Sequence, residues 1–375
     1  MIAVGTRDAG CLATVEPTGA VTLADGSRLD WWVAAEDRWH TPGDEATLRQ
    51  SHTSGVPVVE TSLRVPGGDV VHRVYAEAGG LVVVELENQS NRSVAVAFNR
   101  SDLRFARPPA KVPIEGIDLP PDAVVLPLGH STSVRVGVGA GPGALGHTPG
   151  PDEVRRGWMR QIDRSPTLDL PDADLLDRIR RARADVLLGL GWDLADPVER
   201  CLAAGELVRL GDRGAVWIEP VVEAVTLVVK AVKRGGAGAD EHAAMRRAAE
   251  VLAGVGEHRA ARDVDALRRR FPPASRPAGN AGVRSLVSTI DGLANGSDGV
   301  VTFLSKVDPT WYGQPIEMHD LPLGTGIAGC AVRWHGERPA LLWEVPDGFT
   351  VRCPGLDPTW SSTAATGEAL LSPPP

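Results

Sequence analysis

The feature that most constrains how this chain can fold is a change in the spacing of its apolar residues. Up to about residue 140, apolar and polar residues alternate in short runs. From about residue 152 to residue 271 apolar residues recur three and four positions apart, and from about residue 300 the alternation returns. Alternation is the period of a strand with one buried face, whereas spacings of three and four are the period of an amphipathic helix. Strands, then helices, then strands are therefore expected.

This order predicts an α+β multidomain protein with four segments. Residues 1–140 are expected to form an antiparallel β-sandwich, because turn strings such as DG, PGG and NQSN separate the strands at short intervals. Residues 141–151 are rich in Gly and Pro and are expected to be a linker. Residues 152–297 are expected to form α-helical hairpins, an incomplete α/α toroid. Residues 298–375 are expected to form a small C-terminal β element.

The stretch AVRWHGERPALLWEV, residues 331–345, predicts a β-hairpin with GERP as its turn. Successive residues of a strand face opposite sides of its sheet. Val332 and Trp334 are therefore expected on one face and Arg333 and His335 on the other. In the return strand, Leu341, Trp343 and Val345 are expected to face away from Leu342 and Glu344. Most of the apolar side chains in this stretch are expected in the core, so the stretch indicates architecture rather than chemistry.

The charge balance argues against nucleic acid as a partner. The chain has 39 Lys and Arg residues, 48 Asp and Glu residues and a net charge of −9, whereas phosphate binding favours clustered excess cations. The Arg-rich segments RIRRAR and RDVDALRRRF lie among carboxylates at helical spacing, which predicts solvated helix faces. The sequence contains no run of about 18–20 apolar residues, so no membrane span is expected. The N-terminus lacks the pattern of a secretion signal, so a cytoplasmic location is expected.

No cofactor and no metal are expected from the motifs. The four cysteines form no CxxC pair and have no His/Cys ligand spacing. GTGIAGC, residues 324–330, has the spacing GxGxxG, but a Trp-containing strand rather than a helix is expected after it, so a dinucleotide site is not indicated. GxSxG and HExxH are both absent from the sequence.

Two pairs of carboxylates are the candidates for catalysis, because glycoside hydrolysis uses a pair of carboxyl groups. Glu219 and Glu223 are four residues apart and should share one face of a helix, although Glu219 also suits a first-turn position beside the helix dipole. Glu317 and Asp320 lie in a Pro-bounded loop, YGQPIEMHDLP, which is equally consistent with a solvent-exposed connection.

Aromatic residues are the candidates for ligand binding, because their faces stack on the apolar faces of sugar rings. Trp311, Tyr312 and His319 lie beside the second carboxylate pair. In the N-terminal segment, Trp31 and Trp32 are adjacent in a predicted strand, so one of them must face away from the core. Trp32 and Trp39 are therefore further candidates, with packing between elements as the structural alternative.

Two stretches resemble bacterial glycosidases of the six-hairpin (α/α)-barrel kind, the glucoamylase-like and rhamnosidase-like proteins. VVVELENQSNRSVAVAF, residues 82–98, looks like their sandwich strands, and residues 331–345 are similar to a C-terminal hairpin found in them. The resemblance implies a sandwich beside a helical barrel, with catalytic carboxylates on loops between barrel helices. A full barrel needs twelve helices, well over about 250 residues. The helical region here has only about 120–150 residues, which can supply an arc of a barrel.

Three functions are consistent with this architecture. The first is a protein that binds a saccharide or a glycosylated small molecule without the full catalytic machinery of a glycosidase. The second is an active glycoside hydrolase with a reduced barrel that uses carboxylates among Glu317, Asp320, Glu219 and Glu223. The third is an interaction scaffold or homo-oligomer in which a partner or a second copy covers exposed helix faces.

Overall fold

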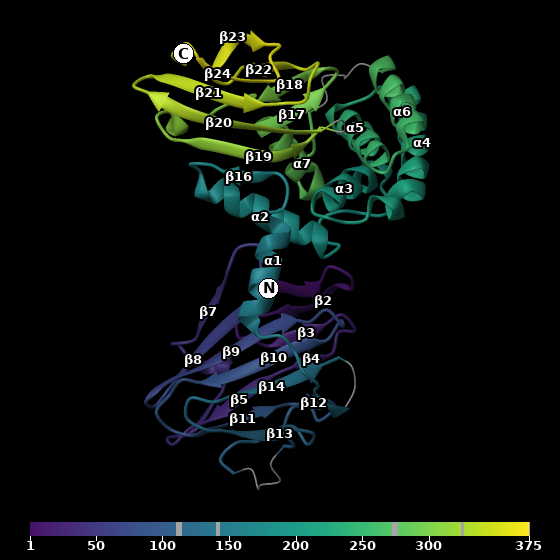
Figure 1. The fold of residues 1–375 in the computed structure, drawn as a ribbon. Helices are drawn as coiled ribbons and strands as arrows, with labels where there is room; N and C mark the ends of the chain where they lie inside the picture. Colours follow the sequence, from purple (N-terminus) through teal and green to yellow (C-terminus); the bar gives the residue numbers. More distant parts are fainter. Residues whose placement is uncertain (110–114, 140–142, 272–276, 324–325, 375) are drawn as a thin grey trace. The chain divides into compact units, whose positions relative to one another are not determined.

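Figure 1 shows the computed structural model of the chain, which describes residues 1–109, 115–139, 143–271, 277–323 and 326–374. The chain divides into two compact units. Unit 1 comprises Met1–Met159 and Leu187–Gly189, and unit 2 comprises Arg160–Val186 and Leu190–Pro375. Sheets make up most of unit 1, whereas unit 2 combines helices with two sheets. The prediction of an α+β multidomain protein is confirmed.

Unit 1 contains three sheets, with strand orders β1-β2-β3-β4, β15-β12-β14-β10-β9-β8-β7 and β13-β11-β5-β6. Its strands and one 3₁₀ turn are β1 (Ile2–Thr6), β2 (Gly10–Val15), β3 (Val21–Leu23), β4 (Arg28–Leu29), β5 (Trp31–Ala34), β6 (Trp39–His40), η1 (Pro42–Asp44), β7 (Arg49–His52), β8 (Val59–Val65), β9 (Gly68–Ala76), β10 (Val82–Asn88), β11 (Val94–Phe98), β12 (Arg104–Phe105), β13 (Val124–Leu128), β14 (Ser133–Val138) and β15 (Gly143–Ala144). Residues from all three sheets share one hydrophobic core.

Alternation along the strands explains this core. In β9, Val70, Val74 and Ala76 belong to the core, and His72 shares their parity. The His72 ring stacks on Trp31 of β5, with ring centroids 4.5 Å apart and planes 16° apart. His72 is 1% exposed, and neither of its ring nitrogens has a hydrogen-bond partner among the described residues. His72 is therefore a buried imidazole that packs on Trp31 without a side-chain hydrogen bond to any residue that the structure describes.

Unit 2 contains the other elements, except that residues 151–159 of α1 and Leu187 of α2 belong to unit 1. The helices and 3₁₀ turns are α1 (Pro151–Ile162), α2 (Ala173–Leu187), α3 (Pro197–Arg209), η2 (Gly214–Trp217), α4 (Ile218–Gly235), α5 (Ala239–Gly254), α6 (His258–Arg270), α7 (Gly282–Leu293) and η3 (Pro309–Trp311). The strands are β16 (Thr167–Asp169), β17 (Ala294–Ser297), β18 (Val300–Phe303), β19 (Ile316–Pro322), β20 (Ile327–His335), β21 (Arg338–Glu344), β22 (Thr350–Cys353), β23 (Asp357–Ser362) and β24 (Thr366–Leu370). They form two sheets, with orders β16-β19-β20-β21-β24 and β17-β18-β22-β23.

Two helix ends in unit 2 coincide with cap residues. The Asp196 carboxylate precedes α3 and accepts hydrogen bonds from the backbone N–H groups of Val198 and Glu199, at 2.8 and 3.3 Å. Gly236 follows α4 with φ of +77°, a conformation that favours glycine. α3 packs against α4, α5 and α7, and α5 packs against α6 as well (Figure 1). This arrangement places side chains from α3, α5 and α7 close together.

The predicted hairpin is confirmed. β20 and β21 pair antiparallel from Gly329–Glu344 to His335–Arg338. The turn is shorter than the predicted GERP, because it consists of Gly336, with φ of +65°, and Glu337, while Arg338 and Pro339 belong to β21. Val332, Leu341 and Trp343 are buried, whereas Arg333, His335, Leu342 and Glu344 are exposed. The face assignment made from alternation is therefore also confirmed.

The segments between the predicted domains also contain regular structure. Residues 141–142 of the predicted linker lie outside the described residues, whereas β15 and the start of α1 fall within it. The predicted helical segment also contains β16, which pairs with β19, and β17. Residues 324–325 of the GxGxxG string likewise lie outside the described residues, and the string continues into β20. Among the helices that the structure describes, none has both the length and the apolar character needed to cross a membrane.

Candidate functional site

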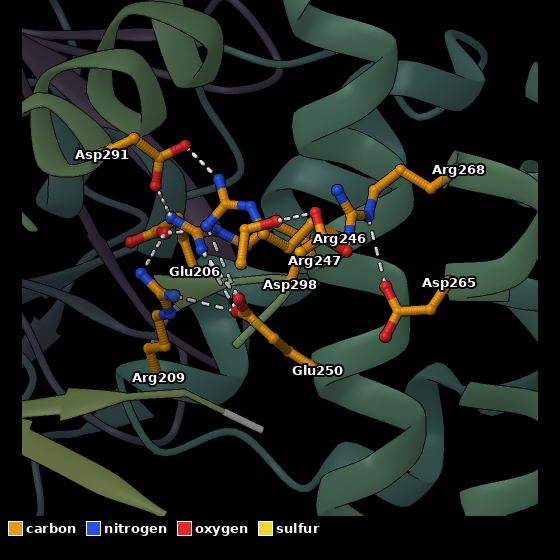
Figure 2. Close-up of polar contacts among 10 residues, drawn as sticks. Glu206, Arg209, Arg246, Arg247, Glu250, Asp265, Arg268, Asp291 and Asp298 are labelled. Carbon is orange, nitrogen blue, oxygen red and sulfur yellow. Dashed lines mark hydrogen bonds and ion pairs between the residues drawn. The ribbon is translucent and has the colours of Figure 1, made fainter. Parts of the chain in front are cut away.

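A network of buried ion pairs connects α3, α5 and α7 in unit 2 (Figure 2). It consists of three arginines and three carboxylates, namely Arg209, Arg246, Arg247, Glu206, Glu250 and Asp291. Glu206 and the side chain of Arg247 are completely buried. Because the charges balance, each buried ion has a partner of opposite sign, which offsets its desolvation.

The first half of the network joins α3 to α5. Arg247 Nε lies 3.3 Å from Glu206 Oε1, and Arg209 Nη1 lies 3.4 Å from the same oxygen. Arg209 Nη2 and Arg247 Nη1 both reach Glu250 Oε2, at 2.8 and 3.1 Å. Gly205 allows this approach, since a Cβ there would lie 2.8 Å from Arg247 Cβ. Glu250 is therefore fixed by two guanidinium groups.

The second half joins α5 to α7. Arg247 Nη2 lies 2.8 Å from Asp291 Oδ1, and Arg246 Nη2 pairs with Asp291 Oδ2. Burial opposes the charged forms of Asp291 and Glu250, but the surrounding guanidinium groups outweigh it, so the pKa of each carboxyl lies below its usual range. Both groups remain ionised near neutral pH.

A second set of ion pairs extends the network to the turn between β17 and β18. Arg268 of α6 pairs with Asp298 at 2.8 Å and with Asp265 at 3.2 Å. Asp298 and Gly299 have φ of +54° and +76° and form the two-residue hairpin turn. The hydrogen bond from Arg268 lowers the pKa of Asp298, despite opposition from partial burial.

Two members of the network and the second set of ion pairs line a cavity of about 660 Å³. Its polar lining includes Arg246 and Glu250 of α5, Arg262, Asp265, Arg268 and Arg269 of α6, and Ser297 and Asp298 of the turn. Alanines of α5 and α6, together with Leu323 and Phe349, supply apolar surface. A second cavity, of about 300 Å³, shares Arg246, Arg268 and Ser297 with the first. The volume of the larger cavity is that of a small-molecule site.

Two buried arginines correct the prediction for the Arg-rich segments, whose arginines are otherwise mostly exposed as predicted. Arg183 of RIRRAR is 2% exposed, and Arg268 of RDVDALRRRF is 7% exposed, although solvated helix faces were predicted for both segments. Arg183 donates to the carbonyl oxygens of Ile162 and Pro166, at 2.8 and 2.9 Å, which compensates for its burial. The sequence contains a signal for this, because Arg183 falls at helical spacing from Ile179 and Val186, on the apolar face.

The predicted carboxylates lie on exposed surfaces of unit 2 and do not line the two cavities. Glu219 and Glu223 share the exposed face of α4, where Glu223 pairs with Arg200 at 3.0 Å. Glu317 of β19 is half-buried and pairs with Arg333 and, at 3.2 Å, with His319. Its pKa is lowered by the hydrogen bond from Arg333. Asp320 is exposed, with φ of +58° at an irregularity of β19.

The predicted aromatic residues are divided between several locations. Trp311 is 6% exposed and belongs to the core of unit 2. Tyr312 lies against Trp334, with ring centroids 5.7 Å apart, whereas His319 is exposed. Alternation along β20 places Trp334 on the opposite face from Arg333, the partner of Glu317. Tyr312 is thus separated from Glu317 and His319 by the sheet.

Trp32 and Trp39 belong to unit 1. Trp31 is buried in the core, and Trp32 is half-buried on the other face, so one tryptophan of the pair faces away from the core as predicted. Trp39 Nε1 donates to the carbonyl oxygen of Glu115 at 2.9 Å. Within the part of the chain that the structure describes, no group of three His, Cys, Asp or Glu side chains is arranged to hold a metal ion.

Comparisons with known proteins add little to this geometry. No protein-family model and no curated protein matches the chain. Among solved structures, the chain is similar to a proposed kojibiose phosphorylase from the human microbiome, with a TM-score of 0.40 and 6% sequence identity over 91% of this chain and 88% of that chain. This likeness is too weak to carry an argument about reaction or ligand.

Proposed function

We propose that unit 2 binds a saccharide, or a small molecule that carries one, in the cavity between α5, α6 and the β17–β18 turn. The observation that carries the proposal is the lining of this cavity, where hydrogen-bond donors and acceptors are held in fixed orientation by ion pairs. A hydroxyl group both donates and accepts, so a ligand rich in hydroxyls matches alternating guanidinium and carboxylate groups. The alanines, Leu323 and Phe349 match the apolar face of a sugar ring.

The electrostatics favour binding without hydrolysis. A glycosidase needs one carboxyl group with a raised pKa, which protonates the leaving oxygen. Asp298 and Glu250, which line the cavity, have pKa values shifted in the opposite direction by their arginine partners. Carboxylates held ionised in this way accept hydrogen bonds but are poor proton donors near neutral pH.

The first experiment screens neutral mono- and oligosaccharides for thermal stabilisation of the full chain, with an aryl-glycoside panel run in parallel. We expect stabilisation by at least one sugar and no release of the aryl group. Turnover would replace this proposal with the hydrolase alternative. If no sugar in the screen stabilised the chain, saccharide binding would be contradicted.

The Asp298→Asn variant tests the location of the site. Asparagine tolerates the same backbone conformation, so the turn is retained while one charged acceptor is lost. We expect affinity for the stabilising sugar to fall at least about tenfold, since a hydrogen bond to a charged group contributes about 1.5–3 kcal/mol. Asp263→Asn is the matched control, because Asp263 is exposed on α6 and does not line the cavity. Equal affinity of both variants would place the ligand elsewhere.

A further inference from the structure

The exposed face of α4 has a charge pattern that is complementary to itself. Two acidic residues, Glu219 and Glu223, lie in its first half, and the basic residues Lys230, Lys233 and Arg234 lie in its second half. Between them lie Thr226 and Leu227, and Leu227 is 41% exposed. The opposite face, with Val221, Val225, Val228 and Val232, is buried. The helix dipole accounts for Glu219 in the first turn and for Lys233 and Arg234 in the last turn, but not for the exposure of Leu227 between them.

We propose that α4 is the contact surface between two copies of this chain, with the two helices antiparallel. A two-fold axis at the midpoint between Thr226 and Leu227 places equally distant residues opposite each other. Glu223 then faces Lys230 of the second copy, and Glu219 faces its Arg234. Thr226 and Leu227 lie next to the axis, so the exposed Leu227 side chains of the two copies meet at the centre. Each ion pair occurs twice, so the surface gains four opposite-charge contacts.

The unit itself uses little of this charge. Glu223 pairs with Arg200 but keeps 66% of its side chain exposed. Within the described ranges, Glu219, Lys230 and Arg234 have no ion pair. Val222 and Val216, which are 46% and 60% exposed, flank the strip and add apolar area. The exposed apolar residues between these unpaired charges of opposite sign are what favours an interface on this face.

The size of the strip determines the expected strength of association. An 18-residue helix is about 27 Å long, which restricts contact mainly to one helix from each copy. Interfaces below about 1,200 Å² in total are typical of weak, transient association. The dimer is therefore concentration-dependent, and because its ion pairs lie near solvent, salt weakens it.

Sedimentation velocity of the full chain over a range of concentrations tests the proposal, together with a charge exchange. Lys230→Glu or Glu223→Lys alone replaces two attractive contacts with like-charge contacts, and we expect each to weaken dimerisation at least tenfold. The double variant with both substitutions restores opposite charges across the axis, and we expect its dimer to be within about threefold of the unmodified one. Lys306→Glu, at an exposed residue outside α4, is the matched control and should leave dimerisation unchanged.

Two results would overturn the proposal. One is a chain that stays monomeric at every accessible concentration. In that case the exposed face of α4 would contact a different partner or solvent. The other is a dimer that does not respond to the single charge reversals, or that the double variant fails to restore. Thermal unfolding of each variant checks that the fold is intact. α4 contributes no residue to either cavity, so sugar binding and dimerisation succeed or fail independently.

Discussion

At the scale of single residues, His72 makes unit 1 sensitive to acid. Burial lowers the pKa of His72 from the ordinary value of 6.5 to about 3. Below about pH 6.5 His72 is protonated in the unfolded chain, whereas in the folded chain it stays neutral down to about pH 3. The free energy of unfolding therefore falls as the pH decreases across this range. Because one pKa unit corresponds to about 1.4 kcal/mol, acidification from pH 7 to pH 5 costs about 2 kcal/mol through this residue.

The His72→Phe variant tests this contribution. Phenylalanine preserves the aromatic stack on Trp31 but does not titrate, so we expect the variant to lose about 2 kcal/mol less unfolding free energy between pH 7 and pH 5 than the unmodified chain. Urea unfolding at both pH values gives the difference. His52→Phe, at an exposed position, serves as control. If the variant and the unmodified chain lost the same unfolding free energy between pH 7 and pH 5, His72 would be protonated in the folded chain at pH 5.

The buried arginines show which residues sequence patterns describe poorly. Alternation correctly separates Trp31 from Trp32 and the two faces of the hairpin, because each depends on neighbours in the same strand. The environment of Arg247 depends instead on Asp291, which is 44 residues away in the sequence and on another helix. Local spacing shows that Arg247 falls among Ala244, Ala248 and Val251, but it does not reveal the partner that permits burial.

At the scale of elements, Gly205 controls how closely α5 approaches α3. Alanine would raise helix propensity by up to about 1 kcal/mol. Its Cβ, however, would lie 2.7 Å from Arg247 Cδ and 2.8 Å from Arg247 Cβ, and overpacking costs about 1–3 kcal/mol. We expect Gly205→Ala to lower the thermal midpoint of the chain.

Gly157→Ala is the matched change in α1, where an added Cβ meets nothing within 4 Å. We expect it to stabilise the helix by about 0.5–1 kcal/mol, since alanine loses less backbone entropy than glycine. If Gly205→Ala stabilised the chain as much as Gly157→Ala, the contact between α3 and Arg247 would be looser than the geometry indicates.

The helices themselves were largely predictable from the sequence, and the candidate site was not. Apolar spacing predicted helices for residues 152–297, where α2 to α7 lie, because this spacing is a local signal, as are cap residues such as Asp196 and Gly236. The cavity forms where α5 and α6 meet the β17–β18 turn, which depends on how the chain returns after α7. The candidate carboxylates chosen from composition, such as Glu317 and Glu219, therefore lie on other surfaces.

At the scale of the whole molecule, the chain crosses between the units more than once. After α2 it places Leu187–Gly189 in unit 1 and then returns to unit 2. Leu188 is 3% exposed, its carbonyl oxygen accepts a hydrogen bond from the Cys11 N–H at 3.0 Å, and its side chain lies beside Gly5. Unit 1 is therefore complete only with a segment that follows α2.

Leu188→Ala tests this dependence. Truncating a buried leucine costs about 2–5 kcal/mol, and we expect the loss to fall on unit 1. Hydrogen exchange should become faster at the amides of β1 and β2, while the amides of β20 and β21 in unit 2 keep their protection. Uniformly faster exchange in both units would mean that the units unfold together.

Because Leu188 belongs to unit 1, that unit can be completed only after residue 188 has been synthesised. Leu188 is made 29 residues after Met159, where the main segment of unit 1 ends. At about 5–20 residues per second, this delay is roughly 1.5–6 s. During that interval the emerging N-terminal sheets lack the residue that covers Gly5 and the Cys11 amide. A nascent chain stalled before Leu188 should therefore be cleaved by protease near β1 and β2 faster than one released after residue 189.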